Sequence, residues 1–152
     1  MNAAPYGTPV SWYDWLLFLH VLAAFLTVTA VGMLVAIALA LRGEARSPVA
    51  LRLAPLAGLL WTVGGVAVLV FGLWLAIYLQ AYHPWDGWII AAIVLWMVAM
   101  AAGGRIGAGL RRLRAADAAG AVDAGQTLAL HAVLVLATLA LLVDMIYKPG
   151  AG

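Results

Sequence analysis

The sequence predicts an all-α protein, a bundle of four transmembrane helices that forms one integral membrane domain over residues 1–152. Hydrophobic residues make up 67% of the chain, charged residues make up 9%, and the mean hydropathy is +1.09. Soluble domains, by contrast, carry about a quarter charged residues. Four apolar segments are each long enough to cross a hydrocarbon core of about 30 Å, which takes about 20 helical residues. These observations together place the chain in the membrane.

The predicted helices follow the apolar segments in chain order. Each segment is expected to be helical, because an open strand leaves backbone groups without hydrogen-bond partners in lipid. The third segment is the shortest in its uncharged part, and a continuation through Leu113 at the membrane surface stays open. The predicted spans are residues 12–41, 53–82, 88–104 and 127–147.

The charged residues predict how the helices are oriented. Every arginine lies in one of two connections, residues 42–52 and residues 105–126, and the connection between them has neither lysine nor arginine. Arginine-rich loops stay in the cytoplasm, so both termini are expected outside. The aromatic residues of the outer ends agree with this orientation, since amphipathic rings favour the membrane interface. We therefore expect a multi-pass protein of the bacterial inner (cytoplasmic) membrane.

The composition also excludes several kinds of site. The chain has no cysteine, so disulfides, iron–sulfur clusters and thiolate metal sites are excluded. Its formal net charge is +2, but the basic residues are few and flank the apolar spans. That pattern indicates membrane topology, and no nucleic-acid partner is expected.

His20 is a titratable ring in the first apolar segment. On a helix, the residues three, four and seven positions after it are Ala23, Ala24 and Thr27, which form a face of small side chains. Small side chains allow another helix to approach closely, or leave space beside the imidazole for a flat ligand such as a porphyrin. The sequence leaves both interpretations open: His20 is either an interhelical hydrogen-bonding residue or the axial ligand of a haem.

A second histidine, His131, lies in the inner half of the fourth segment, between Thr127 and Thr138. At 1.5 Å per residue, His20 and His131 differ in depth by roughly 10 to 15 Å. One haem iron therefore cannot use both. A haem at His20 requires another ligand, a five-coordinate iron, or His20 of a second subunit across a twofold axis. A structural role is the favoured interpretation of His131.

Asp144 and Lys148 lie one helical turn apart at the outer end of the fourth segment. They are expected to form an ion pair, although a proton or cation site at the outer mouth is the functional alternative. In the second segment, Gly58, Gly65 and Gly72 recur every seven residues. This glycine stripe predicts close helix packing.

Two stretches carry a resemblance to known families. YDWLLFLHVLAAFLTVTAVG at residues 13–32 and DMIYKPG at residues 144–150 resemble the beginning and end of an uncharacterised bacterial family of small four-helix integral membrane proteins. LHVLAA in the first segment is more remotely similar to CopD-type copper-resistance membrane domains and to HemJ-type protoporphyrinogen oxidases. The resemblance implies haem ligation by His20. The chain lacks the Trp-x-Gly-Gly that those families carry later in the first helix, so enzymatic activity is not transferred.

The leading hypothesis is a membrane protein that binds a b-type haem at its outer side for electron transfer or haem handling. The cofactor is therefore haem b or none, and the partners are the lipid bilayer and either a second copy of the chain or a larger membrane complex. One alternative is a non-catalytic helical subunit that packs in such a complex through the glycine stripe. Another alternative is a small proton-coupled transporter that uses Asp144.

Overall fold

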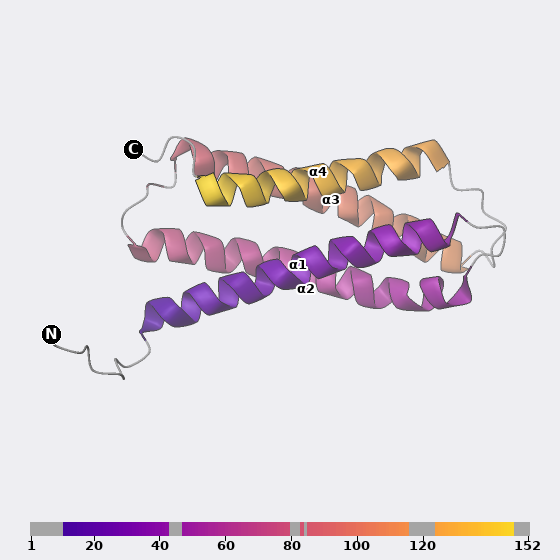
Figure 1. The fold of residues 1–152 in the computed structure, drawn as a ribbon, viewed down its shortest axis with the longest axis horizontal. Helices are drawn as coiled ribbons and strands as arrows, with labels where there is room; N and C mark the ends of the chain where they lie inside the picture. Colours follow the sequence, from indigo (N-terminus) through magenta and orange to yellow (C-terminus); the bar gives the residue numbers. More distant parts are fainter. Residues whose placement is uncertain (1–10, 43–46, 80–82, 84, 116–123, 148–152) are drawn as a thin grey trace, which may run out of the picture.

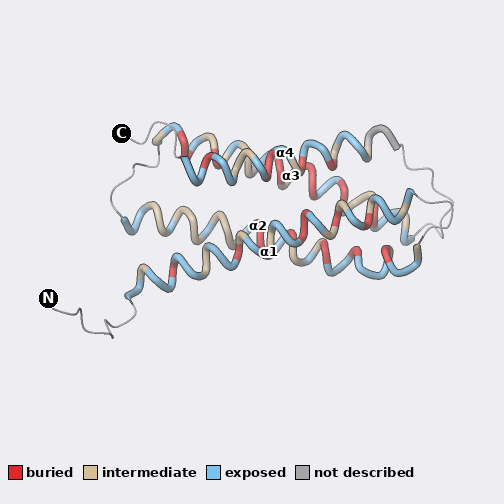
Figure 2. Tube along the Cα trace, viewed as in Figure 1, coloured by how far each residue is buried: buried red, intermediate tan, exposed pale blue. Residues whose placement is uncertain are grey.

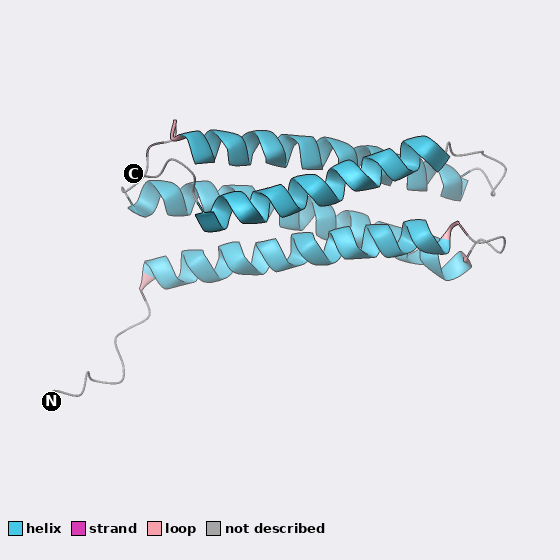
Figure 3. Ribbon diagram, turned by 45° about the horizontal axis from the view of Figure 1, so that its top comes forward, coloured by secondary structure: helices cyan, strands magenta, loops and turns pink. Residues whose placement is uncertain are grey.

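The computed structural model of the protein describes residues 11–42, 47–79, 83, 85–115 and 124–147. In these ranges the chain forms four helices and no strand, which confirms the predicted all-α four-helix bundle. Successive helices run in opposite directions along one axis, as Figures 1 and 3 show from two sides. The helices are α1 (Trp12–Ala40), α2 (Pro48–Leu79), α3 (Gly87–Ala115) and α4 (Ala124–Tyr147).

All four helices are long and apolar enough to cross a membrane, so the chain is a multi-pass membrane protein. The shortest, α4, has 24 residues and is about 36 Å long, which exceeds a hydrocarbon core of about 30 Å. Large apolar side chains such as Phe25, Leu136 and Ile146 are exposed on the outside of the bundle. In water this surface would drive aggregation, whereas in lipid it is the expected surface.

The two ends of the bundle differ in their side chains. We call one of them the arginine end; the described arginines, all exposed, lie at this end or in the half of the bundle next to it, and they are Arg42, Arg52, Arg105, Arg111, Arg112 and Arg114. We call the other the aromatic end; its described aromatic residues are Trp12, Tyr13, Trp15, Tyr78, Trp85, Trp88 and Tyr147. The segregation follows from the alternating helix directions, because every second connection lies at the same end.

Local capping residues set where the first two helices begin. The Ser11 hydroxyl accepts a hydrogen bond from the backbone N–H of Asp14, and the Asp14 carboxylate accepts bonds from both the N–H and the hydroxyl of Ser11. This capping box satisfies backbone donors that have no partner within the helix. At α2, Ser47 precedes a proline in the first helical position, which is a favourable place for proline. The helix therefore begins five residues before the predicted start at Leu53.

The third helix continues past the predicted end at Gly104 as far as Ala115. The predicted span ended at Gly104 because the next residue is charged. Arginine and alanine are nevertheless good helix formers, so the helix continues. The predicted connection 105–126 is thus helical over its first eleven residues. Residues 80–82 and 116–123, which belong to the predicted second helix and second arginine-rich connection, lie outside the described residues.

The helices pack as two antiparallel pairs. The most extensive contacts join α1 to α2 and α3 to α4, whereas α2 and α3 contact each other less and α1 contacts α4 least. The main hydrophobic core is formed by residues 30–37, 50–61, 99–110 and 134–137 of the four helices, so its centre lies towards the arginine end. Figure 2 shows this uneven burial, and no residue of α2 after Gly65 is buried. The aromatic half of α2 therefore contributes little to the core.

Glycine makes the closest contact between α1 and α2. A Cβ atom added at Gly64 would lie 2.8 Å from the Thr27 hydroxyl and 2.9 Å from the Thr27 backbone nitrogen. Because one of these atoms belongs to the backbone, the helices would have to move apart to accommodate it. The Thr27 hydroxyl itself donates to the carbonyl of Ala23, so it needs no partner across the interface.

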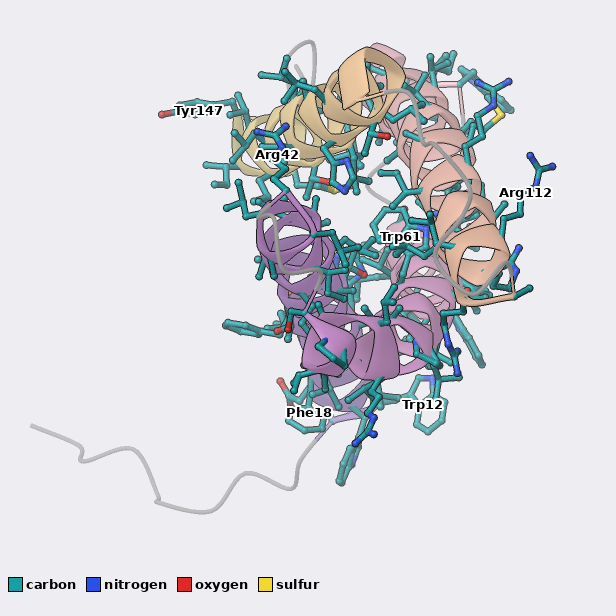
Figure 4. All side chains as sticks on the ribbon, turned by 90° about the vertical axis from the view of Figure 1, so that its right-hand side faces the viewer. Trp12, Phe18, Arg42, Trp61, Arg112 and Tyr147 are labelled. Carbon is teal, nitrogen blue, oxygen red and sulfur yellow. The ribbon has the colours of Figure 1, made fainter. Side chains whose placement is uncertain are left out.

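Trp61 and Trp96 connect α2 to α3. The Trp61 ring is buried inside the ring of four helices, as Figure 4 shows from the arginine end, and it lies directly against Gly103. The Trp96 indole N–H donates to the carbonyl of Gly65 at 2.7 Å. Without a Cβ atom, Gly103 leaves room for a large ring, so two helices with few contacts stay joined.

The close contact at Gly64 generates a prediction with a matched control. We expect Gly64→Ala to destabilise the protein by about 1–3 kcal/mol, the usual range for an added group in a filled interface. Gly58→Ala lies in the same helix with nothing within 4 Å of the added Cβ atom, so it is expected to leave stability unchanged or slightly higher. Thermal unfolding in detergent, followed by circular dichroism, measures both. Equal stability of the two variants would contradict the contact.

Candidate functional site

The His20 ring is seated between α1 and α2. It is half-buried, and its Nδ1 atom lies 3.1 Å from the backbone carbonyl oxygen of Val68. A Cβ atom added at Gly72 would lie 2.9 Å from Cε1 of this ring. The imidazole therefore packs directly against Gly72, and a larger residue at this position would displace the ring.

The hydrogen bond to Val68 determines the tautomer of His20. A carbonyl oxygen only accepts, so Nδ1 must carry the proton and donate it. In the neutral ring, Nε2 then keeps its lone pair. No described residue bonds to Nε2, and this atom is not among the fully buried atoms without a partner. His20 therefore presents one anchored nitrogen and one nitrogen available as an acceptor or metal ligand.

The small face that follows His20 is used mostly for helix packing. Ala23 is buried, and Thr27 packs against Gly64 of α2. Ala24 is half-buried. Of the three residues expected to leave space for a flat ligand, Thr27 thus lets α1 and α2 approach closely instead.

His131 lies in a different environment from His20. It is 8% exposed, and its Nδ1 atom donates to the carbonyl of Thr127 on the preceding turn at 2.7 Å. Its Nε2 atom is buried with no hydrogen-bond partner in the described part of the chain. His20 is eight residues from the aromatic end of its helix, whereas His131 is sixteen residues from that end of α4. The two rings therefore lie at different depths and do not form one site.

Asp144 is a buried carboxyl group on α4. It is 7% exposed, and its Oδ2 atom has no hydrogen-bond partner among the described residues. Lys148, its expected ion-pair partner, lies outside the described residues. Asp14, another carboxyl group of the aromatic end, is exposed and accepts hydrogen bonds from Ser11 in the capping box.

The three glycines of the predicted stripe face different surroundings. A Cβ atom at Gly65 would contact Met100 of α3, one at Gly72 would contact His20 of α1, and one at Gly58 would meet open space. Side chains of this same chain thus cover two of the three positions. Of the three glycines, only Gly58 is open to contact with an external partner.

Several contacts that define the site have no signature in the sequence. The Val68 carbonyl has none, because every residue carries one. Gly64, which packs closely against Thr27 of α1, lies outside the seven-residue stripe that drew attention to its neighbour Gly65. Gly64 and Gly72 share one pattern, a glycine that faces a polar residue of the paired helix. That pattern is the sequence signal for both positions.

The chemistry available to this site is that of a single, oriented imidazole. Within the described ranges, no three histidine, aspartate or glutamate side chains come together to hold a bare metal ion. A metal already held by a macrocycle needs only one or two ligands from the protein. His20 meets that lesser requirement.

Comparisons of the chain with protein-family models, curated proteins and solved structures find no match.

The hydrogen bonds of the two histidine rings predict which nitrogen carries the proton in the neutral form. We expect that nitrogen to be Nδ1 in both His20 and His131, because each Nδ1 atom lies at hydrogen-bond distance from a backbone carbonyl, which can only accept. Nitrogen-15 NMR of protein labelled at histidine distinguishes the tautomers, with His20→Ala and His131→Ala used for assignment. Gly72→Ala is expected to shift only the His20 signals, since its Cβ atom would meet that ring. A proton on Nε2 of His20 would contradict the contact with Val68.

Proposed function

We propose that this chain is a bacterial inner-membrane protein that binds a b-type haem through Nε2 of His20, near the outer surface, for electron transfer or haem handling. The observation that carries the proposal is the hydrogen bond from Nδ1 of His20 to the Val68 carbonyl. Histidines that bind metals commonly donate their second nitrogen to such an acceptor, which fixes the ring and makes the ligating nitrogen more basic.

The position of His20 in the bundle supports the same proposal. The main core lies towards the arginine end, and the aromatic half of α2 contributes no buried residue after Gly65. His20 thus lies in the half of the molecule where the helices have the most capacity for further contacts. Ligands bind between helices of bundles in such places. The His20 ring is half-buried, so a ligand can reach it, and its hydrogen bond to Val68 restricts its rotation.

The residues that fit this cofactor are fewer than the small face of α1 suggests. His20 supplies the ligand, Gly72 holds the ring, and Ala24 is the neighbouring small residue, which is half-buried. We leave Ala23 and Thr27 out of the proposed site because Ala23 is buried and Thr27 packs against Gly64 of α2. When bound, the haem supplies one-electron chemistry at its iron, while the chain fixes the ligand and provides an apolar surrounding.

His131 is not the second ligand in this proposal, since it lies deeper along α4 and its surroundings are those of the core. That leaves a five-coordinate iron, an unassigned ligand, or His20 of a second copy of the chain across a twofold axis. The absorption spectrum distinguishes a low-spin iron held by two histidines from a high-spin iron held by one. The haem-to-protein ratio then tests whether two copies share the group.

The orientation follows from the arginine and aromatic ends. Arginines near the ends of membrane spans stay in the cytoplasm, and aromatic rings favour the interface. The arginine end therefore faces the cytoplasm in this proposal. His20, eight residues from the aromatic end of α1, lies about 12 Å inside the outer end of its helix.

Haem titration of purified protein tests the proposal. In mild detergent the unaltered protein is expected to gain a Soret band, and His20→Ala is expected to lose it. Gly72→Ala should weaken haem affinity about 10–100-fold, as changes beside a metal ligand usually do. His131→Ala is the control and should retain the band. A colourless protein, or an unchanged band in His20→Ala, would rule the proposal out.

Cysteine labelling tests the orientation, because the natural chain has no cysteine background. His83→Cys places a thiol at the aromatic end and Ala115→Cys at the arginine end, and both positions are exposed. We expect a membrane-impermeant maleimide to label His83→Cys in intact spheroplasts and Ala115→Cys only after lysis. The reverse pattern would overturn the orientation while leaving the fold unaffected.

A further inference from the structure

The buried polar side chains of the described part of the chain all lie on α4. They are His131, Thr138 and Asp144, which are 8%, 9% and 7% exposed. The neighbouring helices bury only apolar side chains and glycine, apart from the indole groups of tryptophan. Polar and ionisable groups are costly in a membrane interior, so their concentration on one helix suggests a role for that helix beyond packing.

Thr138 and His131 each form a hydrogen bond to the backbone of their own helix. The Thr138 hydroxyl donates to the carbonyl of Leu134, and Nδ1 of His131 donates to the carbonyl of Thr127. Asp144 differs, because its carboxyl group forms no such bond to its own helix: Oδ2 has no hydrogen-bond partner and the group forms no ion pair among the described residues. Nε2 of His131 also lacks a described partner, but Nδ1 anchors that ring. Asp144 is therefore the buried polar residue of this set that no described bond holds.

Electrostatics limits the forms in which this carboxyl group can be buried. Moving a carboxylate anion out of water without a partner costs several kcal/mol even after the protein relaxes, on the order of the stability of a whole domain. The neutral acid avoids that cost and also gains a hydrogen-bond donor. The buried state of Asp144 thus favours the protonated form.

We propose that Asp144 is a proton-binding site that is protonated in the folded protein at neutral pH and exchanges its proton with the aqueous phase at the aromatic end. The residue lies three positions before Tyr147, the last residue of α4, and thus about 4.5 Å from the end of the helix. The site is close enough to water for exchange and still buried by its surroundings. This proposal is independent of haem binding at His20.

The other described titratable groups near the aromatic end do not pair with Asp144. On the α3 side, the backbone N–H of His83 donates to the Asp86 carboxylate at 3.0 Å. On α1, Asp14 is held by Ser11. None of these groups bonds to Asp144. The remaining described titratable residues of this end are Tyr13, His20, Tyr78 and Tyr147.

The same geometry argues against a proton path through the membrane. His131 is thirteen residues further along α4, which corresponds to about 20 Å of helix and a rotation of about 140°. Between them, Leu134 and Ala137 are buried in the apolar core. A proton on Asp144 therefore returns to the side from which it came.

Loss of the proton has a defined structural consequence. α3 is the principal neighbour of α4, so an unpaired anion at Asp144 would lie in the α3–α4 interface. The charge is stabilised only if water reaches it. Deprotonation is thus expected to separate the aromatic ends of these two helices, which couples helix packing to the pH on that side.

Carbodiimide labelling of the full chain in detergent tests the protonation state. A hydrophobic carbodiimide reacts with a protonated carboxyl group in an apolar environment and leaves a stable acylurea, which mass spectrometry locates. We expect Asp144 to be labelled at neutral pH and the labelling to be lost at alkaline pH. The label is expected to vanish in Asp144→Asn and to persist in Asp14→Asn, whose carboxyl group is exposed.

Two further variants make the result decisive. Asparagine imitates the neutral acid, so Asp144→Asn is expected to fold with an unchanged melting temperature at neutral pH, and a large loss of stability would contradict the proposal. Lys148→Gln tests the ion pair that the sequence predicts. If Asp144 is unlabelled at neutral pH in the natural chain and becomes labelled in Lys148→Gln, the carboxyl group is an ion-paired anion and the proposal is wrong.

Discussion

The structure depends above all on the inability of lipid to form hydrogen bonds. Each backbone group in the membrane must find its partner within a helix, and polar side chains are subject to the same requirement. Thr27, Thr138 and His131 satisfy it by donating to the carbonyl four residues before them. The side chains of His20 and Trp96 donate across helices instead, and both do so to carbonyls of α2. That helix is therefore the common acceptor that fixes the register of α1 on one side and of α3 on the other.

Glycine makes this arrangement possible, because interhelical bonds to backbone carbonyls require close approach. Gly64 admits Thr27, Gly72 admits the His20 ring, and Gly103 admits the Trp61 ring. In water the burial of apolar surface would draw the helices together, but lipid chains are as apolar as the side chains they replace. Close fit and a few directional bonds therefore stabilise the bundle, and single added methyl groups at these glycines matter more than the loss of a surface leucine.

The sequence was sufficient for the number of helices, their approximate bounds and the fold class, because these depend on length and hydropathy. The sequence was insufficient to predict which faces of the helices pack against one another. A helix that is apolar on both its lipid side and its core side has no periodic pattern to distinguish them. The sequence thus had no means of showing that Thr27, expected to stand beside a ligand, packs against Gly64 of α2. The end of α3 at Ala115 was missed for a related reason, since arginines mark where lipid ends and not where a helix ends. The hydrogen bond from His20 to the Val68 carbonyl could not be predicted from residue types, because every residue has a backbone carbonyl.

The uneven core has a consequence for how this protein changes over generations. Because the interlocking side chains concentrate at the arginine end, the determinants of folding and the surface around His20 occupy separate parts of the same helices. Apart from Gly72, which admits the His20 ring, substitutions along the aromatic half of α2, where nothing after Gly65 is buried, alter that surface at little cost to assembly. The surface of one half of the molecule is therefore free to change while the other half preserves the scaffold.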